Sequence, residues 1–295
     1  MNKSFAIFLV VLLSILAISI TGGFIYLLNH EFSFHFLVGG PHYSETLVEE
    51  KTIESLKDLN VISSSGDITV EHTSDNKIIV ELYSDHAEEH YINEEENVVH
   101  IKLSNKAKRV GFNFKADRIL IKLPENYDKN MIIDSNVGDI IIDEFAKSNV
   151  DIKSTTGNLK IKKIDTATIE GKTGDIKIEE VNTLTVSITT GDIKVDKVNN
   201  IEVKSTTGDI KIENITNQLT LTSGTGDIKI NNAEIHEDST IEGRTGDIKI
   251  SNLSGAYVEA NTRVGDTKVN NTEDRKSDIL LKITNNTGDI KVNEK

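Results

Sequence analysis

Two groups of residues have types and spacing that could support chemistry at a metal ion. The first is His86-Ala87-Glu88-Glu89-His90, which matches the H-x-x-E-H pattern of a class of zinc-dependent hydrolases. That chemistry needs a helix that brings both histidines to one metal, a glutamate as general base and a remote third ligand. Here the motif stands in an acidic connection between predicted strands, beside Glu94-Glu95-Glu96. We therefore interpret it as a solvated loop, and a metal-dependent hydrolase using His86 and His90 ranks last among the functions considered.

The second group is a column of aspartates that recurs along the chain. Such carboxylates could bind Ca²⁺, which takes roughly six to eight oxygen ligands. A lysine two residues after nearly all of these aspartates competes for the carboxylate, and each repeat carries one regular glycine where calcium-binding repeats carry more. We predict no metal and no cofactor, and cation binding by this column stays open as the alternative. The column comprises Asp139, Asp175, Asp192, Asp209, Asp227, Asp247, Asp266 and Asp289.

Composition argues against several other classes of function. The formal net charge of −14 is opposite in sign to that of a nucleic-acid-binding domain. Aromatic residues make up 5% of the chain and tryptophan is absent, which disfavours the stacking platforms that sugar-binding surfaces use. The sequence shows no Ser-His-Asp grouping and no glycine-rich phosphate loop. We predict that the protein is not an enzyme, with no nucleic-acid partner and no small-molecule substrate.

A turn of the form Thr-Gly-Asp-Ile-Lys organises the chain, and its glycine returns at intervals of 17 to 23 residues from Gly138 onward. A repeat near this length is typical of a solenoid, in which each short unit buries its apolar face on the next. The glycine is expected to supply a positive φ, and the adjacent Asp or Asn tolerates the turn. The predicted structural turn glycines are Gly66, Gly138, Gly157, Gly174, Gly191, Gly208, Gly226, Gly246, Gly265 and Gly288.

Apolar residues alternate with polar ones on both sides of this turn. Ile176 and Ile178 follow Gly174 with Lys177 between them, and Ile169 precedes it on a second alternating stretch. A period of two is typical of half-buried strands. We therefore predict an all-β fold, a single-stack β-solenoid of about 17-residue coils, each made of two strands of about five residues joined by two turns.

The N-terminal part differs in composition. Residues 5–28 carry no charge and are long enough for one transmembrane helix, and Lys3 before them favours a cytoplasmic N-terminus at residues 1–4. A long cleavable signal peptide is the alternative. We expect a juxtamembrane tether at 29–50, irregular β coils forming an N-terminal cap at 51–130, and the regular solenoid at 131–295. At the C-terminal end we expect an open strand edge, which could template pairing with a partner unless charged residues such as Asp289, Lys291 and Glu294 protect it.

The repeated T-G-D-I-K-I pattern behind one N-terminal span resembles the putative-adhesin domain family, also described as toast-rack repeats. The resemblance covers about residues 50–295, is carried by Gly66-Asp67-Ile68 and the later turns, and is greatest to the LiaG-like membrane-anchored proteins of Gram-positive bacteria. It implies a cell-surface β-solenoid, often encoded near envelope-stress signalling systems, without established catalytic residues.

These observations together predict a non-enzymatic, single-pass membrane protein of a Gram-positive-like bacterium, with its C-terminal domain outside the cytoplasm. We expect it to act as an interaction scaffold or accessory protein in cell-envelope homeostasis, bound to an envelope or membrane protein. The alternative is a surface adhesin that binds a host, matrix or polysaccharide surface. A rod of stacked coils some 40–60 Å long would stay close to the membrane, which favours the scaffold.

Overall fold

The computed structural model describes residues 46–85, 87–104, 117–270 and 277–295. The chain divides into two compact units, Met1–His42 and Tyr43–Lys295, and all described residues belong to the second. The predicted cytoplasmic N-terminus (1–4), transmembrane helix (5–28) and most of the tether (29–50) therefore lie outside the described residues. Within the part that is described, no helix is long and apolar enough to cross a membrane.

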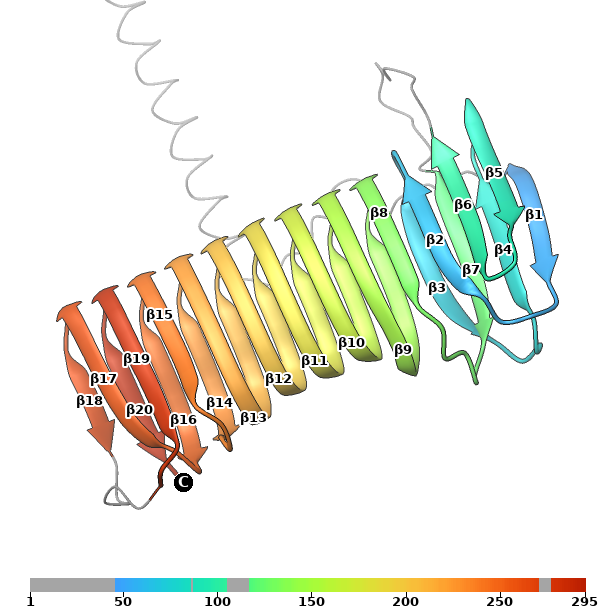
Figure 1. The fold of residues 1–295 in the computed structure, drawn as a ribbon. Coiled ribbons are helices and arrows are strands. Elements are labelled where there is room, and N and C mark those ends of the chain that lie inside the picture. Colours follow the sequence, from blue (N-terminus) through green and yellow to red (C-terminus); the bar gives the residue numbers. More distant parts are fainter. Residues whose placement is uncertain (1–45, 86, 105–116, 271–276) are drawn as a thin grey trace, which may run out of the picture. The chain divides into compact units, whose positions relative to one another are not determined.

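The described part of the second unit consists of strands and turns joined in one 20-stranded sheet (Figure 1). Its N-terminal strands are β1 (Leu47–Ile53), β2 (Asp58–Ser63), β3 (Asp67–Thr73), β4 (Ile78–Tyr83), β5 (Glu89–Glu94), β6 (Val98–Ser104) and β7 (Arg118–Pro124). The central strands are β8 (Met131–Val137), β9 (Ile140–Thr156), β10 (Leu159–Thr173), β11 (Ile176–Thr190), β12 (Ile193–Thr207) and β13 (Ile210–Thr225). The C-terminal strands are β14 (Ile228–Glu234), β15 (Ser239–Thr245), β16 (Ile248–Ser254), β17 (Tyr257–Val264), β18 (Thr267–Asn270), β19 (Leu280–Thr287) and β20 (Ile290–Glu294).

Central coils are single long strands. The strands β9 to β13 have 15 to 17 residues each and fold back midway, so that their halves lie in two layers (Figure 1). The prediction of two five-residue strands with two turns is therefore wrong for these central coils. Each coil is one continuous strand, and only the turn at the glycine separates it from the next. The second corner lacks a turn signal, and the backbone stays extended through it. Extra residues are absorbed there, as at the register shift between Ile164 and Thr166.

Neighbouring coils pair in parallel and in register. Ile176 of β11 lies beside Leu159 of β10 and beside Ile193 of β12. Side chains of one column therefore recur about every 4.8 Å along the stack. The all-β, single-stack solenoid is confirmed.

The core lies between the two layers. Ile176 and Ile178 are buried, the intervening Lys177 is exposed, and Val186 is buried on the returning half. Burying each such side chain contributes about 1.5–3 kcal/mol. Because every coil supplies the same columns, the core is continuous along the stack.

The order of coils in space differs from their order in sequence at both ends. At the C-terminal end, β19 pairs with both β15 and β17, and β20 pairs with both β16 and β18. The last coil of the chain, β19 and β20, therefore lies between the coil of β15 and β16 and the coil of β17 and β18. At the other end, β2 lies between β6 and β8, and β3 between β7 and β9.

This order corrects the expected position of the open edge. Asp289 and Lys291 lie in or beside the inserted strand β20, which has a neighbour on each side. The outermost C-terminal strands are β17 and β18 (Figure 1). At the N-terminal end, antiparallel strands cover the stack: β4 pairs with β7, β1 with β4, and β5 with β6.

Candidate functional site

The turn glycines stack directly on one another, and each has a positive φ between 125° and 144°. A Cβ atom on Gly174 would lie 1.9 Å from the carbonyl oxygen of Gly157 in the neighbouring coil. Both the left-handed backbone and the close approach therefore require glycine at this position.

The residue after each glycine connects neighbouring coils through its side chain. The backbone N–H of Asp192 donates to Asp175 Oδ1 (2.9 Å), and that of Asp209 donates to Asp192 Oδ1 (2.9 Å). Asn158 has the same role, because its amide oxygen accepts from the N–H of Asp175 (3.0 Å). The column requires an acceptor oxygen and not a negative charge. One side-chain oxygen of each aspartate that accepts such a bond is thus used within the fold. In the outermost coil, the N–H of Asp266 donates to Asp289 Oδ1.

The described part of the H-x-x-E-H motif, residues 87–90, contains no helix. His86 lies outside the described residues, and Glu89 and His90 begin β5, where neighbouring side chains point to opposite faces. Glu89 forms an ion pair with Lys102 of β6 (2.8 Å). The expectation of a loop over this stretch is wrong from Glu89 onward. Across the described residues, no three His, Cys, Asp or Glu side chains are grouped closely enough to hold a metal ion.

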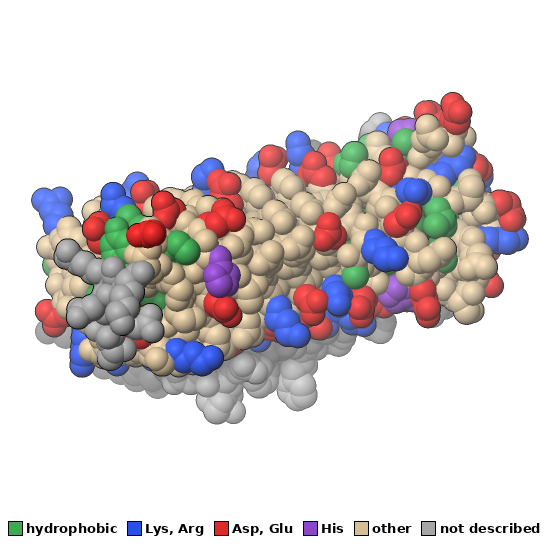
Figure 2. Space-filling model, turned by 60° about the horizontal axis from the view of Figure 1, so that its bottom comes forward, with side chains coloured by type: hydrophobic (Ala, Val, Ile, Leu, Met, Phe, Trp, Pro, Cys, Tyr) green, Lys and Arg blue, Asp and Glu red, His purple; other side chains and the backbone are tan. Residues whose placement is uncertain are grey.

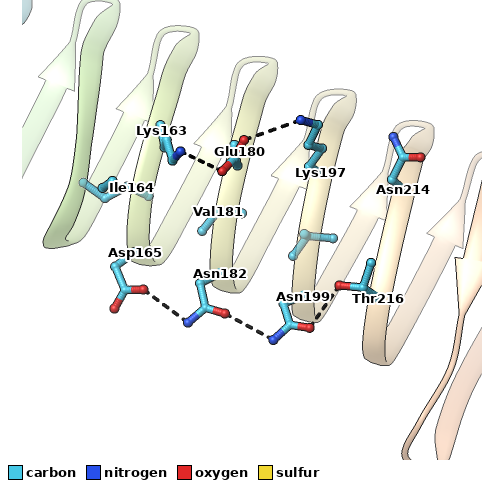
Figure 3. A pocket seen from close by; sticks show the side chains of 12 residues that line it. Lys163, Ile164, Asp165, Glu180, Val181, Asn182, Lys197, Asn199, Asn214 and Thr216 are labelled. Atoms are coloured by element: carbon cyan, nitrogen blue, oxygen red, sulfur yellow. Dashed lines mark hydrogen bonds and ion pairs between the residues drawn. The ribbon is translucent and has the colours of Figure 1, made fainter.

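A groove of about 550 Å³ lies at the second corner of the coils, along β10 to β13 (Figure 3). We call it the corner groove. Ile164, Val181 and Val198 form its floor, and their side chains are almost completely covered. The residues that line it are Ala146, Lys163, Ile164, Asp165, Glu180, Val181, Asn182, Lys197, Val198, Asn199, Asn214 and Thr216.

One wall of the corner groove is a chain of hydrogen bonds across four coils (Figure 3). Asn182 Nδ2 donates to Asp165 Oδ1 (3.2 Å), and Asn199 Nδ2 donates to Asn182 Oδ1 (3.2 Å). Thr216 Oγ1 donates to Asn199 Oδ1 (3.0 Å). The bonds orient all the amide groups in one direction, so this wall offers donors and acceptors at a regular spacing.

The other wall carries alternating charges. Lys163 Nζ lies 2.9 Å from Glu180 Oε1, and Lys197 Nζ lies 3.6 Å from Glu180 Oε2 (Figure 3). The hydrogen bond to Glu180 raises the pKa of Lys163, and the hydrogen bond from Lys163 lowers the pKa of Glu180. Both groups are therefore charged near neutral pH. Their side chains are partly exposed, so salt screens their attraction.

Charged side chains lie mainly along the margins of one face of the molecule (Figure 2). Figure 2 shows uncharged polar side chains and backbone over much of one face, with Lys, Arg, Asp and Glu along its margins. The corner groove thus combines an apolar floor, an amide wall and a charged wall. Such an arrangement suits repeated hydrogen bonds and ion pairs to an extended partner.

Sequence reasoning did not find the corner groove. Its walls occupy the columns six and eight residues after each turn glycine: Lys163, Glu180, Lys197 and Asn214 in one, Asp165, Asn182, Asn199 and Thr216 in the other. Both columns are polar but not uniform, so they lack the plain regularity of the glycine column. Aligning the repeats and reading every column would have revealed the run of amides.

Comparison with known proteins adds a family to this geometry. The family model described as Toastrack DUF4097 matches residues 56–197 and 179–295. The chain belongs to this family. The repeated turn, the stacked strands and the match over nearly all described residues agree, and the resemblance to toast-rack repeats is confirmed. No match is found among curated proteins.

Solved structures with similarity to this Toastrack chain include three bacterial proteins. A protein described as a putative adhesin of Bacteroides fragilis is 17% identical, with a TM-score of 0.44, covering 85% of this chain and 98% of that chain. A putative lipid binding protein of Parabacteroides distasonis is 14% identical, with a TM-score of 0.42, covering 83% and 96%. A putative adhesin of Parabacteroides merdae is 13% identical, with a TM-score of 0.44, covering 85% and 98%. Similarity at this level carries no argument about function.

Proposed function

We propose that this Toastrack protein is a non-enzymatic, membrane-anchored scaffold that binds another component of the cell envelope and takes part in envelope homeostasis. The observation that carries the proposal is the corner groove, in which the same two polar columns recur over β10 to β13 at the spacing of the strands. The proposed anchor is the uncharged stretch 5–28, and the proposed location of the β-solenoid is outside the cytoplasm.

The groove supports binding better than a reaction. Its polar groups are already paired with each other along the stack, as Asn182 is with both Asp165 and Asn199. A catalytic centre needs one nucleophile or base placed against one reacting atom, whereas here equivalent groups repeat. Repetition instead gives many weak contacts that add up over the length of a partner.

A surface adhesin is the second candidate. Regular spacing along the corner groove favours it as well, because a polymer with a short repeat could contact every coil. The scaffold and the adhesin differ in the identity of the partner. For the scaffold it is an envelope or membrane protein, and for the adhesin it is a polysaccharide or a foreign surface.

Crosslinking of the full-length protein in cells, followed by mass spectrometry of the material that co-purifies from membranes, tests the proposal. A defined envelope or membrane protein is expected among the products. A variant with residues 1–30 exchanged for an unrelated span shows whether that partner contacts the span or the solenoid. Recovery of wall polymer or foreign surface material alone would replace the scaffold by the adhesin, and recovery of the protein from the cytosol would contradict both.

A further inference from the structure

The C-terminal end of the stack has an open sheet edge formed by β17 and β18, which we call the terminal edge. Within the described residues, β17 pairs with β19 alone and β18 pairs with β20 alone. Insertion of the last coil produces this arrangement, since the coil at 257–270 is displaced to the outside. Unpaired N–H and C=O groups on such an edge are a template for another strand.

Backbone contacts in the preceding coils show which groups the terminal edge offers. Gly288 N–H donates to Val264 O, and Ile290 N–H donates to Asp266 O, each time toward the next coil. The equivalent donors of the outermost coil are the N–H groups of Gly265 and Thr267, which no further described coil covers. Along β17, the N–H of Tyr257 points to Ile279 of the inner coil, so alternation directs Val258, Ala260 and Thr262 outward.

Side chains on the terminal edge differ from those in the inner coils. Ala260 pairs with Ile283, and Thr267 pairs with Ile290, so two apolar columns end in smaller or polar residues. Val264 is 59% exposed. The outermost coil therefore contributes fewer large apolar side chains to the core, but its backbone N–H and C=O groups can still pair with another strand.

The charges on β17 are complementary to themselves in one register. Glu259, Asn261 and Arg263 are exposed and alternate along the outer face of the strand. When a second β17 lies antiparallel with Asn261 opposite Asn261, Glu259 of each copy faces Arg263 of the other. Val258 then faces Val264, and Ala260 faces Thr262. The backbone groups of Val258, Ala260 and Thr262 point outward, whereas Val264 O accepts the N–H of Gly288 in the inner coil. In a parallel arrangement, each charge would face its own kind.

The second strand of the terminal edge fits the same symmetry axis. Asn261 lies four residues before Gly265, and Val269 lies four residues after it, so both are at the same level of the coil. An axis through Asn261 of β17 therefore passes near Val269 of β18. In that register Lys268 faces Asn270 of the second copy, and the two lysines are not opposed.

We propose that two copies of this chain join through their terminal edges, with β17 against β17 and β18 against β18 in antiparallel pairs around a two-fold axis. The contact closes the only open edge among the described C-terminal strands and satisfies its backbone groups. A symmetric contact of this kind is self-limiting, because it leaves no equivalent edge for a third copy.

Cysteine crosslinking of the full-length protein in membranes tests this arrangement, since the chain has no cysteine of its own. Asn261→Cys places one thiol of each copy at the axis, where antiparallel Cα atoms lie about 4.5–5.5 Å apart, within reach of a disulfide. We expect mild oxidation to convert most of this variant to a covalent dimer. Thr185→Cys, on an exposed position of the central strand β11, is the matched control and is expected to stay monomeric.

Charge exchange separates this contact from a chance collision. In the Asn261→Cys background, Glu259→Arg alone and Arg263→Glu alone each place like charges opposite one another, and dimer yield should fall several-fold. The double exchange Glu259→Arg with Arg263→Glu restores the opposite charges and should restore the yield. Equal crosslinking of the control, no response to the single exchanges, no recovery in the double variant, or capture of a different protein in place of the dimer would each overturn the proposal.

Discussion

Each turn position holds the next coil with two groups, the backbone of a glycine and the side-chain oxygen of the residue after it. Gly191 has a φ of 143°, and Asp192 Oδ1 accepts the N–H of Asp209. Neither interaction involves the net charge of the aspartate. At the scale of single residues, geometry and an acceptor oxygen therefore explain why this column tolerates Asn158.

Replacing a turn glycine should cost far more stability than replacing a glycine elsewhere in the same coils. In Gly191→Ala, the added Cβ would lie 2.0 Å from Gly174 O at a strained φ, and we expect a loss of at least about 2 kcal/mol. The control is Gly171→Ala, whose Cβ would meet Ile188 Cγ1 at 3.3 Å without a positive φ, and which should cost about 1 kcal/mol or less. Urea unfolding measures both, and similar losses would contradict the assigned role of the turn.

The acceptor role of the acidic column predicts that two substitutions at one site will change the free energy of unfolding by different amounts. Asp192→Asn keeps an oxygen for the N–H of Asp209 and should change the free energy of unfolding by less than about 0.5 kcal/mol. Asp192→Ala removes the acceptor and should cost about 1 kcal/mol. Denaturant unfolding at neutral pH distinguishes them. A large loss in the asparagine variant would mean that the charge itself matters.

Residue types allowed prediction of the turn but not of the corner groove. The glycine column and the buried pair Ile176 and Ile178 are nearly invariant from coil to coil, so a single sequence reveals them. The groove depends on Asn182 and Asn199, whose column also contains aspartate and threonine. Its hydrogen bonds form between residues of different coils, and a local stretch of sequence does not show which distant residues pair.

At the scale of elements, the coils are interchangeable building blocks. Because β19 pairs with β15 on one side and with β17 on the other, sequence order does not decide the stacking order. The central strands continue through the second corner because the residues there, such as Val181 and Asn182, include no glycine or proline and give no turn signal. Alternation of apolar and polar residues in the sequence predicts which residues are buried. The spatial order of the coils, in contrast, can be read only from the structure.

Stacking order at the C-terminal end can be tested with paired cysteines in this cysteine-free chain. Lys249 of β16 pairs with Lys291 of β20, and Lys291 pairs with Lys268 of β18. Adjacent strands are about 4.8 Å apart, within the range of a disulfide, whereas strands two positions apart are not. We expect an intramolecular disulfide in Lys249→Cys/Lys291→Cys and none in Lys249→Cys/Lys268→Cys. The reverse result would restore the sequence order.

The antiparallel cap contains an ion pair with a defined pH dependence. Burial raises the pKa of Glu81, but hydrogen bonds from Lys122 and Tyr83 outweigh it and leave the pKa below its ordinary value of 4.5. A carboxyl group whose pKa is lowered on folding stabilises the fold above its unfolded pKa, and this contribution is lost as pH falls through the folded pKa. Stability should therefore decline less steeply below pH 4.5 in Glu81→Gln than in the unmodified protein.

Thermal unfolding between pH 3 and pH 7 measures this difference. The control is Glu242→Gln on the exposed face of β15, which should follow the curve of the unmodified protein. Parallel curves for Glu81→Gln and the unmodified protein would show that the ion pair between β4 and β7 does not contribute as described.

At the scale of the whole molecule, regular stacking aligns polar side chains into continuous columns. The proposed scaffold would bind its partner through the amide and charged groups that the corner groove presents at strand spacing over β10 to β13. Such binding requires no catalytic group. The proposed pairing at the terminal edge would place two such grooves in one assembly. The proposed scaffold function requires that the partner binds in the corner groove.

Site-specific photo-crosslinking in whole cells tests that claim most directly. A photoreactive amino acid replaces Asn182 in the corner groove or, as the control, Lys177 on the exposed face of the same strand. We expect a discrete crosslinked envelope partner from position 182 and little or none from position 177. Equal capture from both positions, or capture from position 177 alone, would contradict binding in the corner groove.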